Sequence, residues 1–150
     1  MKLRSLITGL LLASSMLSCL PKSAIELRGV EKFGISTFGK TSLTGDAVFY
    51  NPNSSRMKLR QIKIDIYLDG EKTAEVNQNT KVVAKPRSEF TVPVAIDLSD
   101  NVKISDLLLN VLGGKKREVH YKGHLKVNLN GIPMRIPIDH KEEFNMSIKF

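Results

Sequence analysis

YKGHLKVNLNGIPMRIPID, residues 121–139, is the stretch that decides the fold of this 150-residue chain. Large apolar side chains such as Leu125 and Ile136 stand at every second position, which places them on one face of an extended strand. Asn130-Gly131 separates the two alternating runs, and both residues tolerate the positive φ that a two-residue hairpin turn requires. The sequence therefore predicts a β-hairpin with strands over 119–129 and 132–139.

The same two-residue period recurs along most of the chain. Asp69-Gly70 gives a second turn of the same chemistry. Pro93 lies inside an alternating run, where its missing N–H favours an edge strand. Together these patterns predict strands over residues 24–30, 43–50, 58–68, 72–77, 90–98, 119–129, 132–139 and 144–149.

One segment has helical spacing. An apolar stripe with a period near 3.6 residues is formed by Ile104, Leu107, Leu108, Val111 and Leu112. Gly113-Gly114 follows the stripe and can end the helix. Many short strands with one crossover helix predict an all-β fold, a two-sheet antiparallel β-sandwich in a single domain.

Two apolar features allow either a structural or a ligand-binding interpretation. The stripe over 104–112 covers the core in an ordinary way, or it leaves space for an acyl chain between the helix and the sheets. The segment 32–45 mixes Phe33, Ile35 and Phe38 with glycine, serine and threonine. It predicts an irregular edge strand, which we favour, or a loop that touches lipid.

The first nineteen residues look like an export signal with a lipidation site. Lys2 and Arg4 precede a short apolar run that cannot cross a bilayer stably. Cys19 is the only cysteine and follows the small Ser18. This arrangement resembles the lipobox of bacterial lipoproteins, in which the cysteine thiol receives a diacylglyceryl group and the cysteine becomes the new N-terminus.

We therefore expect a signal peptide over 1–18, a lipidated N-terminus and linker over 19–23, and a folded domain over 24–150. Two alternatives stay open at this point. The signal can be cleaved after the small residues 13–15, or the chain can stay unprocessed with Cys19 as an ordinary apolar residue.

Charge restricts the expected partners. Removal of residues 1–18 takes away two of 23 basic residues, Lys2 and Arg4, and leaves 21 against 15 acidic ones, a net charge of +6. A basic domain tethered to a bilayer can lie against anionic lipid headgroups. Lysines without interleaved aromatic residues do not predict nucleic-acid binding. We expect the membrane as partner through Cys19, with envelope proteins or anionic headgroups as further partners; lysines that only keep the surface solvated are the alternative.

Nothing in the sequence predicts catalysis. There is no Gly-x-Ser-x-Gly elbow and no phosphate-binding glycine loop. His120 and His124 share a strand face but stand about 13 Å apart along it, too far for one metal ion. Asp139, His140, Glu142 and Glu143 lie close together in the sequence and could form a metal site. They fit a solvated turn as well, and we prefer that interpretation. We expect no enzyme, no cofactor and no metal.

A family resemblance rests on several short motifs in order. Asn51-Pro52-Asn53 ends a strand-like run: Pro52 fixes a turn position, and Asn53 accepts positive φ or bonds the local backbone. Asp69-Gly70, Phe90-Thr91-Val92-Pro93-Val94, Tyr121-Lys122-Gly123-His124-Leu125 and Ile136-Pro137-Ile138 follow. Over about residues 25–148 the chain resembles the type 2 late-embryogenesis-abundant family, also called the water-stress and hypersensitive-response domain.

The resemblance implies an immunoglobulin or fibronectin type III-like β-sandwich with a short helix. Members of the family are associated with desiccation and stress tolerance, some related domains are suspected of binding lipids, and no catalytic residues transfer. The lipobox distinguishes this chain from the plant members.

We therefore expect a lipid-anchored, non-enzymatic envelope binding or stress-protective module. The alternative is a lipid- or apolar-ligand-carrying domain that uses the space between the 104–112 helix and the sheets. The expected location is the cell envelope, and the outer membrane in a Gram-negative host, because Leu20 and not aspartate follows Cys19.

Overall fold

The computed structural model describes residues 24–36, 42–106, 109 and 116–144. They form seven antiparallel strands: β1 (Glu26–Ser36), β2 (Ser42–Asn51), β3 (Met57–Leu68), β4 (Glu71–Ala84), β5 (Ser88–Leu98), β6 (Arg117–Leu129) and β7 (Ile132–Phe144). Their order in the sheet is β1-β2-β5-β4-β3-β6-β7. The prediction of an all-β antiparallel fold is confirmed.

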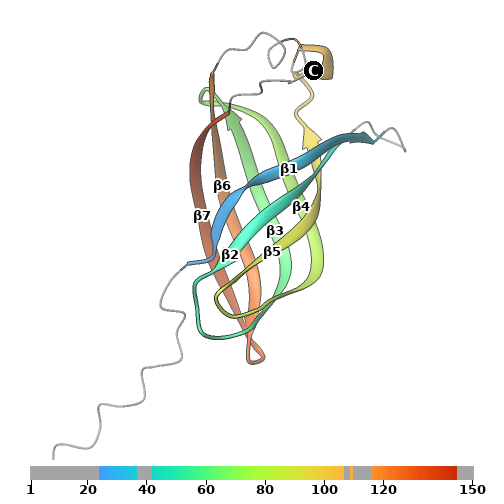
Figure 1. Cartoon of the computed structure of the whole chain (residues 1–150). Helices are drawn as coiled ribbons and strands as arrows, with labels where there is room; N and C mark the ends of the chain where they lie inside the picture. Colours follow the sequence, from blue (N-terminus) through green and yellow to red (C-terminus); the bar gives the residue numbers. More distant parts are fainter. Residues whose placement is uncertain (1–23, 37–41, 107–108, 110–115, 145–150) are drawn as a thin grey trace, which may run out of the picture.

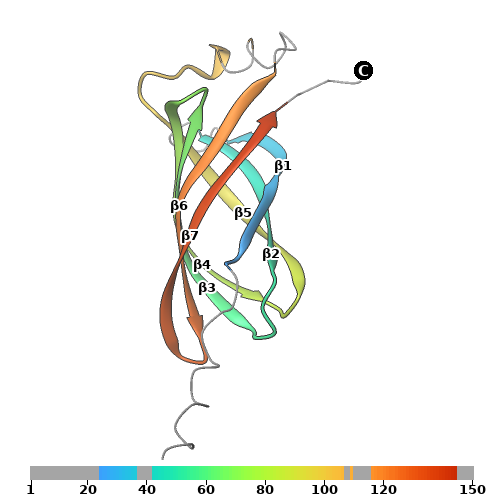
Figure 2. The same ribbon diagram turned by 90° about the vertical axis from the view of Figure 1, so that its left-hand side faces the viewer.

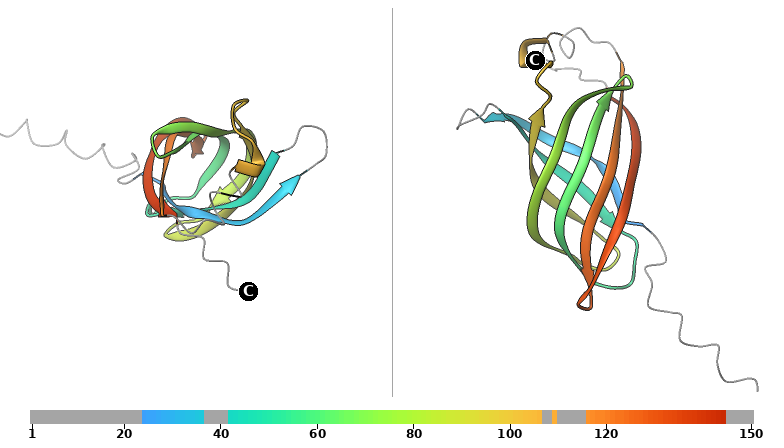
Figure 3. Two further views of the ribbon diagram at one scale, coloured as in Figure 1. Left: turned by 90° about the horizontal axis from the view of Figure 1, so that it is seen from above. Right: turned by 180° about the vertical axis from the view of Figure 1, so that it is seen from behind.

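The sheet curls into an incomplete barrel (Figure 1 and Figure 2). β1, β2 and β5 form one wall, and β3, β4, β6 and β7 form the wall that faces it, as the view from above shows (Figure 3). β1 and β7 stand at the two ends of the strand order, and no ladder joins them in the part of the chain that is described. The immunoglobulin or fibronectin type III type of sandwich is not confirmed, because the two walls belong to one curled sheet.

The two walls are joined by a short ladder of backbone pairing between β4 and β5. These strands pair only at Ala74 with Leu98 and Glu75 with Asp97 among the described residues. Farther along, the Gln78 side chain takes over the role of a backbone peptide group: its Nε2 donates to Pro93 O at 2.8 Å, and the N–H of Ala95 donates to its Oε1 at 2.9 Å.

This split explains Pro93. The predicted edge position is wrong, because β5 lies between β2 and β4. The carbonyl of Pro93 nevertheless faces the split, where β5 has no backbone ladder with β4. A proline, which has no N–H to donate, costs no ladder bond at such a position.

We expect Gln78→Met to lower the free energy of unfolding by about 1 kcal/mol, because two solvent-exposed hydrogen bonds between the walls are lost. Urea unfolding monitored by circular dichroism measures this change. Asn79→Ala, at the next and exposed position of β4, is the control. An equal effect of the two substitutions would show that Gln78 does not hold the walls together.

The core lies between the walls and follows the alternation of the sequence. Phe49 and Val92 come from one wall and Leu59 and Leu125 from the other, and all four are completely buried. The rings of Phe49 and Phe90 stack with centroids 5.5 Å apart. Full burial of each such side chain contributes about 1.5–3 kcal/mol, so this core is the main source of stability.

The structure confirms both two-residue hairpin turns. Asn130 and Gly131 have φ angles of 51° and 85°, and Asp69 and Gly70 have 50° and 87°. The fourth strand is longer than predicted, because β4 continues from the expected end at residue 77 to Ala84. The predicted strand over 144–149 lies outside the described residues, except for Phe144 at the end of β7.

The predicted helix over 104–112 is described only in part. Residues 104–106 and residue 109 are helical, and the others lie outside the described residues. The N–H of Asp106 donates to the carbonyl of Lys103 at 3.0 Å in this turn.

Candidate functional site

The proposed lipidation residue, Cys19, lies outside the described residues, as do the predicted signal peptide and linker. The described chain begins at Ala24, and β1 starts with Glu26 opposite Tyr50, one residue before the end of β2. Residues 19–23 can span at most about 18 Å when fully extended.

An open seam between β1 and β7 forms a cleft of about 460 Å³. Its walls are residues 24–28 at the start of β1 and residues 137–140 of β7. Arg28 and Glu26 form an ion pair at 3.0 Å on the β1 side. The volume falls within the range of small-molecule sites, and the lining mixes apolar and charged groups.

Polar residues replace apolar ones on the inner face of β7 beside this seam. Ile136 and Ile138 are buried, and the next two positions with the same orientation are His140 and Glu142. The hydroxyl of Tyr121 donates to Glu142 Oε1 at 2.8 Å. Burial, and then the Glu142 carboxylate, raise the pKa of Tyr121 above its ordinary value, so the hydroxyl stays protonated and continues to donate.

His140 lies against this pair. Its Nε2 is 3.7 Å from Glu142 Oε2, and its ring centroid is 6.1 Å from that of Tyr121. The Nε2 atom is buried and has no hydrogen-bond partner within the described part of the chain. The three side chains can orient one another, but the hydroxyl is tied to Glu142 and is not poised as a nucleophile.

The candidate metal site does not form. Successive strand residues point to opposite faces, so His140 and Glu142 face inward while Asp139 contacts His120 at 2.5 Å on the outer face. Glu143 pairs with Lys116 at 3.8 Å. No group of three His, Cys, Asp or Glu side chains within the described ranges could hold a metal ion. The preferred turn is also wrong, because these residues continue β7 to Phe144.

The contact between His120 and Asp139 predicts a pH dependence. The hydrogen bond to His120, followed by the charges of His120, Lys122 and Lys141, holds the pKa of Asp139 below its ordinary value. A carboxylate with a depressed folded-state pKa contributes stability that is present above the unfolded value and is lost as the pH falls through the folded one.

We therefore expect Asp139→Asn to lose less stability than the parent chain when the pH is lowered from about 5 to about 3. Urea unfolding at the two pH values measures this difference. Asp97→Asn is the control, because Asp97 makes no ion pair with any other described residue. Identical acid sensitivity of both variants and the parent would contradict the assignment.

The other two histidines do not act together. His120 also lies 6.0 Å from the Tyr67 ring, whereas His124 stands opposite Lys63 on β3. Burial, and then the charges of Arg135, Lys126 and Lys63, lower the pKa of His124. His124 therefore belongs to a positively charged surface and not to a catalytic pair.

One interior cavity among the described residues is too small for an apolar ligand. This cavity of about 20 Å³ is lined only by core residues, including Ile62, Val94 and Tyr121. This volume is far below the roughly 300 Å³ at which ligand pockets begin. The predicted space beneath the 104–112 helix falls mainly on residues outside the described ranges.

β1 continues past residue 32 to Ser36 at the edge of the sheet, and its register shifts between Leu27 and Gly29 and between Glu31 and Gly34. The favoured edge-strand interpretation is confirmed for that part. Phe33 and Ile35 are 42% and 51% exposed, and Phe38 lies outside the described residues.

Asn51 has a structural role that its sequence motif did not predict. Asn51 is completely buried, and its Nδ2 donates to the carbonyls of Ser55 at 3.0 Å, Lys85 at 3.1 Å and Ala84 at 3.3 Å. Its Oδ1 accepts from both the N–H and the side-chain amide of Asn53, each at 3.1 Å. Ala47, Phe49 and Asn51 alternate on one strand, and this parity already places Asn51 on the core face.

No described helix is long and apolar enough to cross a bilayer. The described residues form an antiparallel β-fold with an open seam between β1 and β7, and Tyr121, His140 and Glu142 form a polar cluster beside this seam.

Residues 47–142, more than half of the chain, match the late embryogenesis abundant protein family. The chain belongs to this family, in its type 2 branch. It is 28% identical to an uncharacterized protein of Methanocaldococcus jannaschii, over 97% of this chain and 83% of that protein.

Two solved structures are similar in fold. A solution structure of a protein from Arabidopsis thaliana has a TM-score of 0.56 at 13% identity and covers 91% of this chain and 90% of its own. A crystal structure of a protein from Archaeoglobus fulgidus has a TM-score of 0.50 at 18% identity and covers 83% of this chain and 100% of its own.

Proposed function

We propose that the protein is a lipid-anchored, non-enzymatic module of the cell envelope, with a binding or stress-protective role. Cys19 carries the lipid, and residues 24–150 form the folded domain. Two or more acyl chains hold a protein at a bilayer far longer than one, at about 0.8 kcal/mol per buried methylene.

The observation that carries this proposal is the position of Cys19 relative to the sheet. The cysteine follows a leader with a short apolar run, and β1 begins at Glu26, only seven residues later. A linker of this length suits a domain that is held directly at the membrane surface. An ordinary buried cysteine has no reason to stand at the junction between leader and fold.

Two features support a non-enzymatic role. The family brings no catalytic residues with it. The polar side chains that could begin a reaction are paired with one another: Tyr121 donates to Glu142, and His120 contacts Asp139. Such pairs stabilise strand contacts, and the Tyr121 hydroxyl, held by Glu142, is not poised as a nucleophile.

The test is membrane fractionation of the full chain in a bacterial host. We expect the parent protein in the membrane fraction and the Cys19→Ser variant in the soluble fraction. Ser18→Ala is the matched control, since it keeps a small residue before the cysteine and should leave the protein in the membrane. Unchanged membrane association of Cys19→Ser would contradict the proposal.

The alternative function is carriage of a lipid or another apolar ligand. The seam cleft of about 460 Å³ supports this alternative, because its volume suits a small ligand. Native mass spectrometry of gently purified residues 19–150 with Cys19→Ser, which removes the covalent lipid, distinguishes the two functions: a carrier shows added mass from a retained ligand, and a module without a ligand shows the bare protein mass.

A further inference from the structure

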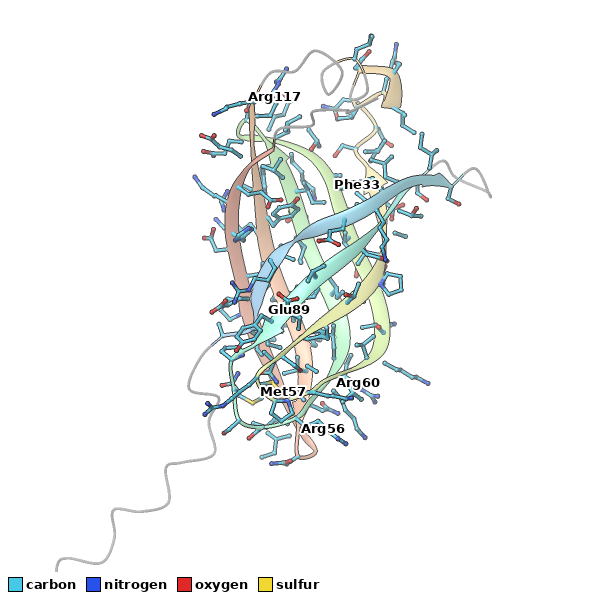
Figure 4. All side chains as sticks on the ribbon, viewed as in Figure 1. Phe33, Arg56, Met57, Arg60, Glu89 and Arg117 are labelled. Carbon is cyan, nitrogen blue, oxygen red and sulfur yellow. The ribbon has the colours of Figure 1, made fainter. Side chains whose placement is uncertain are left out.

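Positive charge is concentrated at one end of the sheet. We define the basic end as the three turns at residues 52–56, 85–87 and 130–131, together with the four strand residues on either side of each turn. It contains eight cations: Arg56, Lys58, Arg60, Lys81, Lys85, Arg87, Lys126 and Arg135. Glu89 is its one carboxylate, although the chain has 15 acidic residues, all within the described ranges. Arg56 and Arg60 lie at this end in Figure 4, and Arg117 lies at the opposite one.

The eight cations are exposed and lack counter-charges. None of them forms an ion pair with another described residue. Several cations elsewhere are paired: Lys72, for example, pairs with both Asp65 and Glu75 at 2.8 Å. Like charges gathered without partners repel one another in the free protein, and an anionic surface relieves this repulsion.

The basic end also presents apolar side chains. Ile132, 63% exposed, stands directly after the Asn130-Gly131 turn, and the exposed Pro133 follows it. Val83 is 38% exposed beside the turn at 85–87. Apolar tips surrounded by cations suit the boundary between headgroups and acyl chains. The basic end bears no aromatic side chain that is exposed, so base stacking is not favoured.

The chain enters the fold near the basic end. Glu26, the first residue of β1, pairs with Tyr50, and Tyr50 pairs with Glu89, two residues beyond the turn at 85–87. The start of β1, drawn in blue, lies toward the side of these turns (Figure 1). A lipid on Cys19 would therefore hold the basic end toward the bilayer.

We propose that the basic end docks on the anionic lipid headgroups of the membrane that carries the anchor. This inference deepens the proposed function and rests on it for the anchoring. The eight cations lie against the headgroups, Ile132 enters the interface, and the end of the sheet that carries Asp69 and Arg117 points away from the bilayer.

The test uses residues 19–150 with Cys19→Ser, since the described sheet has its own complete core. Co-sedimentation is measured with vesicles of phosphatidylcholine alone and of phosphatidylcholine with phosphatidylglycerol. The test variant is Arg56→Gln, Arg60→Gln, Lys85→Gln and Arg87→Gln combined. The matched control removes four exposed cations outside the basic end, by Lys32→Gln, Lys103→Gln, Lys116→Gln and Lys141→Gln, and thermal unfolding checks that both variants fold.

We expect salt-sensitive binding to the anionic vesicles only. Each cation near the headgroups strengthens binding about fivefold, so the test variant should bind at least about a hundredfold more weakly. The affinity of the control variant should change little. Ile132→Ser should weaken binding without changing its dependence on salt.

Three results would overturn the inference: no preference for anionic vesicles, equal losses in the two variants, or tighter binding to duplex DNA than to anionic vesicles at the same salt. Because the test protein carries no lipid, these results are independent of the anchor. Failure of lipidation in cells would leave vesicle binding intact, and failure of vesicle binding would leave the anchor intact.

Discussion

Asn51→Ala is expected to lower the free energy of unfolding by about 3–4 kcal/mol. The Asn51 amide connects the turn after β2, through the Ser55 carbonyl, with the turn after β4, through the carbonyls of Ala84 and Lys85. Removal of the amide breaks its bonds to these three carbonyls and the two bonds that it accepts from Asn53, and the bond to Ala84 is fully buried. Urea unfolding at neutral pH measures the loss.

Two further variants sharpen this test. Asn51→Asp keeps the shape and the accepting oxygen but turns a second acceptor toward the three carbonyls, so it should destabilise at least as much as alanine. Asn128→Ala, at a half-buried asparagine opposite Lys58, should cost less than about 1 kcal/mol. A loss below about 1 kcal/mol for Asn51→Ala would show that the amide does not hold the two turns together.

Gly123→Ala is expected to destabilise the sheet by about 3 kcal/mol and to lower the Tm by roughly 10 °C. A Cβ atom at this position would lie 2.1 Å from the Lys63 carbonyl oxygen and 2.8 Å from Ile64 Cα. Both are backbone atoms of β3, so no side chain can rotate away, and the pairing of β3 with β6 must shift.

Differential scanning calorimetry measures this effect. Lys122→Ala, at the adjacent exposed position of β6, is the control and should change the free energy of unfolding by less than about 0.5 kcal/mol. If Gly123→Ala melted at the temperature of the parent chain, the close approach of β6 to β3 would be refuted.

The strands were predictable where one face is apolar and the other polar. The hairpin of β6 and β7 shows this, because alternation fixes the inward residues and Asn130-Gly131 fixes the turn. The second half of β4 was not predictable, because Asn77, Gln78 and Asn79 put polar side chains on both faces and so show no apolar–polar alternation. Their pairing with Gln61, Ile62 and Lys63 of β3 comes from tertiary structure.

The curled sheet was harder to predict than its strands. Alternation tells which side chains face the core, but it does not tell which strand edges pair. A sandwich and an incomplete barrel bury the same faces. The two folds differ at the junction of β4 and β5, where the Gln78 side chain replaces backbone pairing. No local sequence pattern predicts such a contact.

The functional features divide in the same way. Cys19 could be proposed as a lipidation site from the sequence, because the expected export signal has a local pattern. The basic end could not, because its eight cations come from segments between residues 56 and 135 and meet only after the three turns are brought together. The net charge of residues 19–150, +6, gives the sign of the surface charge but not its location.

The most direct test of lipid anchoring is mass spectrometry of the N-terminal peptide of the mature protein, isolated from membranes. The account predicts a peptide that begins at Cys19 and carries the mass of a diacylglyceryl group on the thiol. A peptide that begins at another residue, or one with an unmodified Cys19, would contradict it.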